Sequence, residues 1–440
     1  MGRKVILFLL SGLALLLTAV AIAASAVQPT AAHGSRYEVW AIDQSDTRDD
    51  GGGTLYIYDG DALSRQDPTK AVPEVIDLGG AARDLCLAET GSAPRRPHMM
   101  MFNHHSHSHA IITFVATGHV LFMHGATRAP VACIDVGVQA HAATPSHDET
   151  YAVVANQNGK LLQRIRTDYA TNSFTLEDAA TINLATCTTP SGAACQDPLL
   201  RPDNAPICPI VDTSSRLSFV TLRGGGLFVV DSAATPMRIV AEYDQATIHP
   251  NGCGGVETTG KMYINAGGGT AANPFESDLY AFSLDDFSTT PNAPNTPAPQ
   301  LVFSHDVRRF VDSHGAALIP RGRYLWLADR AANRVVIVDT RTDKPIDEIE
   351  LFGRLSPNPA PDLLDSSPSG DLMFVTLRGP NPLTGNAPGI NNAAGSTPGL
   401  GIMLVKQGGR QGELRALIPI THPVNGVELA DPHGVAVRRK

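Results

Sequence analysis

Short apolar segments that recur in pairs are the feature that most limits what this chain can fold into. In each pair a first segment of about 4 to 7 residues leads through a turn to a second, which often ends in Asp. Examples are Leu217–Arg223 with Leu227–Asp231, Tyr324–Asp329 with Arg334–Asp339, and Leu372–Arg378 with Gly401–Val405. Segments that are apolar on both sides and rich in Val, Phe and Tyr are typical of strands covered on both faces of a sheet.

The spacing of these pairs predicts the architecture. They recur about every 40 to 65 residues, and no stretch after residue 26 has a helical period of three turns. Sheets that are covered on both faces and repeat without helices are the blades of a β-propeller. We therefore predict an all-β, seven-bladed β-propeller over residues 37–440, with loop insertions at 184–209, 284–300 and 379–400.

The two ends of the chain set the number of blades. Innermost strands are predicted to start near Asn103, His141, Pro209, His249, His314 and Asp362, and Asp431–Val437 supplies a seventh at the C-terminus. The N-terminal segments Tyr37–Asp43 and Thr54–Asp59 lack an innermost strand of their own. We expect the C-terminal strand to pair with them, because this pairing completes the seventh blade and leaves no open edge between first and last blades.

The blade pattern resembles that of a known superfamily. Asp312–Asp329 followed by Asn333–Asp339 is similar to a blade of the seven-bladed YVTN-type and cytochrome-d1-like propellers, and the likeness covers most of residues 37–440. It implies the fold and carries over no catalytic residue, since functions in that superfamily range from haem enzymes to binding scaffolds.

The N-terminus and the cysteines indicate a compartment. Arg3 and Lys4 precede an apolar run, and Ala24-Ser25-Ala26 fits signal peptidase cleavage, so residues 1–26 are predicted to be a signal peptide of a periplasmic or secreted protein. An uncleaved membrane anchor is the alternative. Six Cys in an oxidising compartment predict disulfides of open connectivity, with Cys187–Cys195 the easiest local pair.

Charge and missing motifs exclude several function classes. The net charge of −9 argues against nucleic acid as a partner, because phosphate binding needs a basic face. No Cys-x-x-Cys-His is present, which excludes covalently attached c-type haem, and no phosphate-binding or dinucleotide motif supports a nucleotide cofactor. After cleavage of the signal peptide, no association with the membrane is expected.

Histidines at repeating positions are the sharpest chemical signal among the 15 in the chain. His141, His249, His314 and His433 recur at blade spacing near the predicted starts of innermost strands, where blades converge on the channel. Two of them share the phrase Asp-x-His-Gly, so Asp312 and Asp431 are predicted to orient His314 and His433 as second-shell partners.

A second histidine tract lies in the predicted blade 2. His105, His107 and His109 are expected to alternate onto one strand face, downstream of three Met at 99–101. Imidazole and thioether ligands suit copper or zinc, so these seven histidines are the predicted metal ligands. Two other interpretations remain open: the histidines form structural hydrogen bonds between blades, or they respond to pH.

Two arginines complete the candidate residues. Arg223 and Arg378 follow equivalent second strands, and they are predicted either to face an anionic ligand or to form salt bridges between blades. The leading hypothesis is an exported binding protein whose channel holds a small ligand or a metal. The alternatives are a propeller enzyme, either a copper-type oxidoreductase or a lactonase-like hydrolase using Asp312, Asp362 and Asp431, and a scaffold whose insertion loops bind a protein partner.

Overall fold

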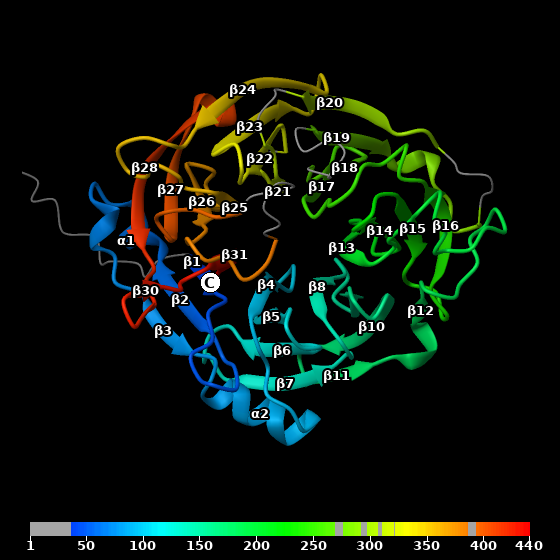
Figure 1. The fold of residues 1–440 in the computed structure, drawn as a ribbon, viewed down its shortest axis with the longest axis horizontal. Helices are drawn as coiled ribbons and strands as arrows, with labels where there is room; N and C mark the ends of the chain where they lie inside the picture. Colours follow the sequence, from blue (N-terminus) through cyan, green and yellow to red (C-terminus); the bar gives the residue numbers. More distant parts are fainter. Residues whose placement is uncertain (1–36, 269–275, 292–296, 307–309, 321, 386–392) are drawn as a thin grey trace, which may run out of the picture. The chain divides into compact units, whose positions relative to one another are not determined.

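The computed structural model describes residues 37–268, 276–291, 297–306, 310–320, 322–385 and 393–440; the predicted signal peptide lies outside them. These described residues belong to one compact unit that contains seven antiparallel four-stranded sheets, the blades, arranged around a common centre (Figure 1). This confirms the predicted seven-bladed propeller. Blade 3 carries one further short strand, β12.

The blades are numbered from the N-terminus, and each is given from its innermost strand outward. Blade 1 consists of β31 (Pro432–Arg439), β1 (Tyr37–Asp43), β2 (Thr54–Asp59) and β3 (Glu74–Asp77). Blade 2 consists of β4 (Pro97–Phe102), β5 (His109–Phe114), β6 (His119–His124) and β7 (Pro130–Asp135). Blade 3 consists of β8 (Ala140–Pro145), β9 (Tyr151–Asn156), β10 (Leu161–Asp168) and β11 (Ser173–Leu176), with β12 (Ile182–Asn183).

Blades 4 to 7 follow in chain order. Blade 4 consists of β13 (Pro206–Val211), β14 (Leu217–Leu222), β15 (Leu227–Asp231) and β16 (Arg238–Tyr243), and blade 5 of β17 (Gly255–Thr258), β18 (Lys261–Ala266), β19 (Glu276–Ser283) and β20 (Gln300–Asp306). Blade 6 consists of β21 (Ser313–Leu318), β22 (Tyr324–Asp329), β23 (Arg334–Asp339) and β24 (Lys344–Glu350). Blade 7 consists of β25 (Pro361–Ser366), β26 (Leu372–Leu377), β27 (Gly399–Lys406) and β28 (Gln411–Pro419).

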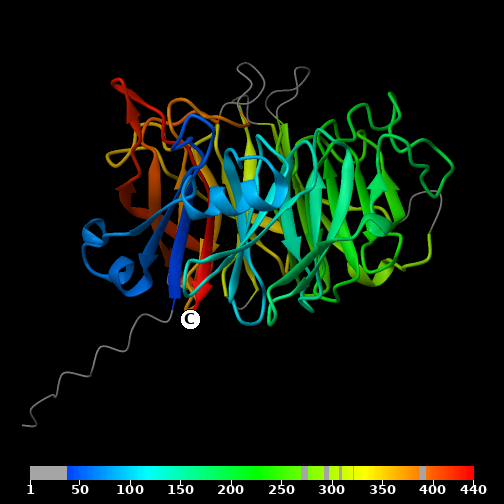
Figure 2. The same ribbon diagram turned by 90° about the horizontal axis from the view of Figure 1, so that it is seen from below.

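The C-terminal strand closes the ring as predicted. β31 pairs antiparallel with β1, with Trp40 opposite Ala436 and Val39 opposite Val437. Both views show β31 beside β1 although they lie at opposite ends of the sequence (Figure 1, Figure 2). Blade 1 therefore joins the two ends of the propeller and leaves neither β1 nor β31 as an open edge.

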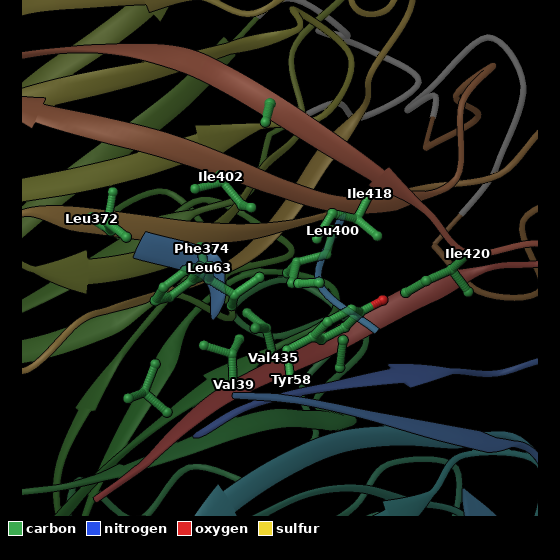
Figure 3. Packing of buried hydrophobic residues seen from close by; sticks show 14 of the residues in the cluster. Val39, Tyr58, Leu63, Leu372, Phe374, Leu400, Ile402, Ile418, Ile420 and Val435 are labelled. Atoms are coloured by element: carbon green, nitrogen blue, oxygen red, sulfur yellow. The ribbon is translucent and has the colours of Figure 1, made fainter. Parts of the chain in front are cut away.

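The hydrophobic core lies between neighbouring blades. Strands such as β23 are buried along their whole length, as expected for sheets covered on both faces. Between blades 7 and 1, Phe374 and Ile402 pack against Val39, Tyr58 and Val435 (Figure 3). Burying aliphatic and aromatic side chains of this size stabilises the fold by roughly 1.5–3 kcal/mol each.

Among the described residues, the helices, the 3₁₀ turns and one two-stranded hairpin lie outside the blades. They are α1 (Gly60–Ser64), α2 (Ala81–Thr90), the 3₁₀ turns η1 (Pro68–Lys70), η2 (Asp178–Ala180), η3 (Leu284–Asp286) and η4 (Gln407–Gly409), and the hairpin β29 (Pro423–Val424) and β30 (Val427–Glu428). Neither helix approaches the length and hydrophobicity that crossing a bilayer requires. The described loop residues of the predicted insertions lie between β12 and β13 (184–205), between β19 and β20 (284–291 and 297–299) and between β26 and β27 (379–385 and 393–398); the predicted insertions extended into the starts of β13, β20 and β27.

All six cysteines form disulfides. Cys187–Cys195 closes a local loop, as expected, while Cys86–Cys133 links α2 to β7. Cys208–Cys253 joins β13 to the segment that leads into β17. Three disulfides are typical of proteins from oxidising, extracytoplasmic compartments.

Candidate functional site

The second residue of the innermost strand carries a titratable side chain in five blades. These residues are His98 in β4, His141 in β8, His314 in β21, Asp362 in β25 and His433 in β31. All five are buried, with at most 8% of their surface exposed. In blade 4 the same position holds Ile207, and β17 of blade 5 begins only after Cys253.

A break in strand pairing at this position aims the side chains toward the centre. Pro97 pairs with Phe114, and the ladder resumes only at Met100, past His98. The pairing with the second strand is also interrupted beside His141, His314, Asp362 and His433. β-Bulges of this kind re-aim a side chain, so the repeated bulge turns a regular blade position into a site position.

Glycines let the bulged strands come close together. A Cβ on Gly315 would lie 2.3 Å from the carbonyl oxygen of Asp362, and one on Gly434 would lie 2.8 Å from that of His98. A side chain at either position would therefore push the neighbouring innermost strand away. This explains why glycine follows His314 and His433 in the Asp-x-His-Gly phrase.

The histidines contact one another across blade boundaries. The His98 and His433 rings stack with centroids 3.8 Å apart, and His98 Nε2 lies 3.3 Å from His141 Nε2. His314 packs edge-on against His433 at 5.2 Å. Four blades thus bring their imidazoles into one buried cluster, which we call the central cluster together with Asp362.

Asp362 is the carboxylate of the central cluster. Its Oδ1 accepts a hydrogen bond from His314 Nδ1 at 2.5 Å, and its Oδ2 lies 3.6 Å from His433 Nε2. Arg378 donates to Asp362 at 2.8 Å and to Asp431 at 2.6 Å. Asp362 therefore joins the histidines to a buried network of charges.

Two further side chains complete that network. Arg330 donates to both oxygens of Asp312 at 2.8 and 2.9 Å and lies 3.5 Å from Asp362. Gln44 donates to Asp431 at 2.9 Å and accepts from His98 Nδ1 at 2.8 Å. In blades 1, 6 and 7, the residue that directly follows the second strand (Gln44, Arg330 and Arg378) therefore links its own blade to the next one.

Burial and charge set the protonation of the cluster. Burial lowers the pKa of His98 and His433 well below its ordinary value, and it lowers that of His141 to about 3. Burial also lowers the pKa of His314, with Arg330 adding to the effect. For Asp362 burial acts in the opposite direction, but the surrounding groups, Arg330 and Arg378 among them, hold its pKa well below the usual range. Neutral imidazoles around an ionised carboxylate are the forms that bind metal ions.

His433 has a ring nitrogen that no donor satisfies. Its Nδ1 donates to the carbonyl oxygen of His98 at 3.1 Å, so the neutral ring carries a lone pair on Nε2. Among the described residues this buried Nε2 has no hydrogen-bond partner, and it lies 3.6 Å from Asp362 Oδ2. Two acceptors that face each other in a buried site call for a cation between them. One potential ligand atom from each of His314, Asp362 and His433 lies within 4.8 Å of the others.

Three of the predicted ligands meet in the cluster, but the two Asp residues that were predicted to orient His314 and His433 pair differently. His141, His314 and His433 come together, whereas the carboxylates of Asp312 and Asp431 bind Arg330 and Arg378. The expected pairing of Asp312 with His314 and of Asp431 with His433 is wrong. It assumed a regular strand, while both Asp residues precede their strand and a bulge follows.

His249 lies away from the other histidines of the predicted ring. It precedes β17 in a loop, with its side chain 36% exposed, and pairs with Asp278 at 2.5 Å and Glu276 at 3.6 Å. These three side chains form a separate group of potential metal ligands. The innermost strand of blade 5 begins at Gly255, so the predicted start near His249 is displaced.

The histidine tract of blade 2 is a turn rather than one strand. β4 ends at Phe102 and β5 begins at His109, so His105 is exposed in the turn and His107 is half-buried. His109 is buried, and its Nε2 donates to Asn172 Oδ1 at 2.7 Å. The expectation that these three histidines share a strand face is wrong, because the chain reverses between Asn103 and Ser108.

The two predicted arginines have different environments. Arg378 is fully buried in the network, where it bridges blades 7 and 1 through Asp362 and Asp431. Arg223 is 40% exposed at its side chain and pairs with Asp203 at 2.5 Å. The two arginines stand at equivalent positions of their blades, but Arg378 belongs to the buried network and Arg223 forms an ion pair near the surface.

Sequence reasoning missed His98, Gln44 and Arg330. Pro97-His98 repeats the phrase Pro432-His433, and this signal was available in the sequence. Arg330 follows β22 as Arg378 follows β26. Gln44 carries no comparable signal, since its role depends on the closure of blade 1.

A cavity of about 440 Å³ adjoins the central cluster within the ring of innermost strands. Innermost strands of all seven blades contribute to its wall, which is mainly apolar and includes Met101, Ile210, Val256 and Leu318. Met99, Cys208 and Cys253 lie between this cavity and the histidines, since they line the cavity and also contact His141 or one another.

Comparison with known proteins supports the fold alone. No protein-family model and no curated protein matches the sequence. Among solved structures, the periplasmic gluconolactonase PpgL of Pseudomonas aeruginosa matches with a TM-score of 0.57 and 12% identity, over 91% of this chain and 99% of that one. A hypothetical selenium-binding protein from Sulfolobus tokodaii matches with a TM-score of 0.61 and 9% identity, over 92% and 94%. A putative 6-phosphogluconolactonase from Bacteroides fragilis gives 0.55 and 10%, over 91% and 98%.

Proposed function

We propose that this protein is an exported propeller that binds a divalent transition metal ion through His314, His433 and Asp362. The observation that carries the proposal is the buried Nε2 of His433, which has no hydrogen-bond partner within the described part of the chain and faces the Asp362 carboxylate. A metal cation satisfies both acceptors at once. The three side chains are buried and come from three blades, so closure of the ring assembles the site.

The donor set favours zinc first and copper second. Two neutral imidazoles and one carboxylate form the ligand set of catalytic zinc sites, which keep a fourth position for water or substrate. Copper also accepts imidazole ligands. His98 and His141 lie beside this set and support it through stacking and hydrogen bonding.

Enzymatic function is the second candidate. Gluconolactonase and phosphogluconolactonase are named among the structural matches, and a cavity of about 440 Å³ has the size of a small-molecule site. The pairing of Asp312 and Asp431 with buried arginines argues against these two carboxylates as the catalytic groups of a metal-free hydrolase. A lactone panel assayed with metal-loaded and metal-stripped protein distinguishes a lactonase from a metal-binding protein.

Export is part of the proposal. Three disulfides and the predicted signal peptide at residues 1–26 both fit an oxidising compartment. Fractionation of producing cells, with mass spectrometry of the mature N-terminus, tests whether cleavage falls after Ala26. An intact N-terminus in the membrane fraction would contradict export as a soluble protein.

Metal analysis of protein purified without a histidine tag tests the central site. We expect one zinc or copper ion per chain after loading and removal of excess, and its loss in the variant His314→Ala/His433→Ala. The matched control is His105→Ala/His249→Ala, which removes two histidines outside the central cluster and should retain the ion. His433→Gln, a milder change, should weaken binding about 100-fold while circular dichroism confirms the fold.

Two results would contradict the proposal. One is wild-type protein that takes up no metal under these conditions. The other is metal that remains in His314→Ala/His433→Ala and disappears in His105→Ala/His249→Ala, which would place the ion at the group formed by His249, Glu276 and Asp278.

A further inference from the structure

Three sulfur-containing side chains form a layer beneath the histidines. The Sδ of Met99 lies 3.8 Å from Cys208 Sγ and 3.8 Å from Cys253 Sγ, and Cys208 Sγ lies 3.9 Å from His141 Nδ1. All are buried, and Met99, Cys208 and Cys253 line the cavity. We call these four residues the sulfur layer.

The ring geometry builds this layer. Met99 follows His98 in β4, and Cys208 follows Ile207 in β13, so both occupy the position after the one that forms the central cluster. Cys253 comes from the segment before β17. Residues from blades 2, 3, 4 and 5 therefore converge on one point of the channel wall.

The other two disulfides have different surroundings. Cys86–Cys133 packs in the apolar core between blades 1 and 2, and Cys187–Cys195 closes a loop in which Cys187 is only half-buried. Cys208–Cys253 instead contacts a thioether and an imidazole, and it borders a cavity of about 440 Å³. This combination indicates chemistry beyond cross-linking.

We propose that Cys208–Cys253 is a redox switch whose reduced form binds one Cu(I) ion together with Met99 and His141. A dithiol reductant attacks the disulfide, becomes a cyclic disulfide itself, and leaves two cysteine thiols, so two electrons and two protons pass to the protein. Cu(I) then displaces the thiol protons. Thiolate and thioether ligands select Cu(I) among biological metals, and imidazole completes the set.

The sulfur layer contains none of the three proposed zinc ligands, so the two sites can be tested independently.

Titration of metal-stripped, full-length protein with Cu(I) tests the switch. A chromophoric Cu(I) chelator competes for the ion under anaerobic conditions, before and after treatment with dithiothreitol and removal of the reductant. We expect the reduced protein to take up one tightly held Cu(I) that the oxidised protein does not. X-ray absorption should report sulfur ligands on the bound copper.

Matched variants assign the copper to the sulfur layer. Cys208→Ser/Cys253→Ser should lose the copper bound by reduced protein, whereas Cys86→Ser/Cys133→Ser, whose loop is of similar length, should keep it. Met99→Leu conserves volume and should lower the Cu(I) affinity about tenfold. His314→Ala/His433→Ala should keep this copper, which separates failure here from failure of the central site.

Three outcomes would overturn the proposal. The first is equal Cu(I) uptake by oxidised and reduced protein. The second is loss of copper in the Cys86/Cys133 pair variant but not in the Cys208/Cys253 pair variant. The third is an unchanged affinity in Met99→Leu with a copper spectrum that contains no sulfur ligands.

Discussion

Two sectors of the ring of innermost strands differ in the residue that occupies the second position of the strand. In the polar sector, formed by β21, β25, β31, β4 and β8, the second residue is His or Asp and belongs to a buried network. In the sulfur sector, formed by β13 and the segment entering β17, Ile207 replaces the polar residue and a disulfide joins the two blades. The blade therefore provides a position, and the residue there decides the chemistry.

The comparison also separates two means of holding blades together. In the polar sector, Arg378 bridges Asp362 of blade 7 and Asp431 of blade 1 without exposure to solvent. In the sulfur sector, the covalent Cys208–Cys253 bond joins blades 4 and 5. Ion pairs can be broken one residue at a time, so the two means can be compared by mutation.

The largest effect is expected from Arg378→Met. Removal of the guanidinium takes the bridging cation away from two buried carboxylates, which costs about 3–5 kcal/mol of unfolding free energy. The matched control is Arg223→Met, at the equivalent position after β14, where the 40%-exposed side chain pairs with Asp203. That exposed pair should contribute less than about 1 kcal/mol. Urea unfolding of both variants measures the difference, and equal losses would show that the polar sector does not depend on Arg378.

Removal of the Cys208–Cys253 bond should have a somewhat smaller effect. Cys208→Ala/Cys253→Ala is expected to lose about 2–4 kcal/mol, mainly because the unfolded chain gains conformational freedom. Cys86→Ala/Cys133→Ala makes an internal control, since the two bonds span 45 and 47 residues and should stabilise similarly on this account. A loss below about 1 kcal/mol for the channel pair alone would mean that packing, rather than the bond, holds the sulfur sector.

The fold could be predicted because its signal is local. Pairs of apolar segments mark each blade, and the unpaired segments at the two ends indicate how the ring closes. The innermost strands of blades 2 and 5 were predicted to start near Asn103 and His249, but they start at Pro97 and Gly255. Polar turn residues at the predicted positions resemble the strand starts of other blades. Pairing with the second strand decides between such candidates, and that pairing is a long-range contact.

The site could be predicted only in part for the same reason. His141, His314 and His433 stand at repeat positions, so spacing alone brings them together. The contacts of Asp362 with His314 and Arg378 depend on bulges and on close approach of neighbouring strands at Gly315 and Gly434, which no local pattern encodes. The pairing of Cys208 with Cys253 likewise follows from the order of blades around the channel.

The smallest effect concerns a carboxylate that shares a polar-sector strand but has no arginine hydrogen-bonded to it among the described residues. Asp365 lies on β25 with Asp362, lines the cavity, and accepts hydrogen bonds from the backbone N–H groups of Ser366 and Val437. Burial raises its pKa from 3.8 to about 6, whereas the pKa of Asp362 is held low. The groups that surround each carboxyl, and not the strand, therefore set the direction of its pKa shift.

This difference predicts a dependence of stability on pH. Between pH 4 and 6 the folded state holds a proton on Asp365 that the unfolded state has released, so the contribution of this group to stability is full below pH 4 and is lost as pH rises through about 6. Asp365→Asn cannot ionise, so its unfolding free energy should rise relative to wild type by about 1–2 kcal/mol from pH 4 to pH 7, allowing for water in the cavity. Denaturant unfolding of both proteins across that range measures the change. A constant difference between the two curves would mean that Asp365 ionises as freely when folded as when unfolded, and that burial beside the cavity does not distinguish it from a surface carboxylate.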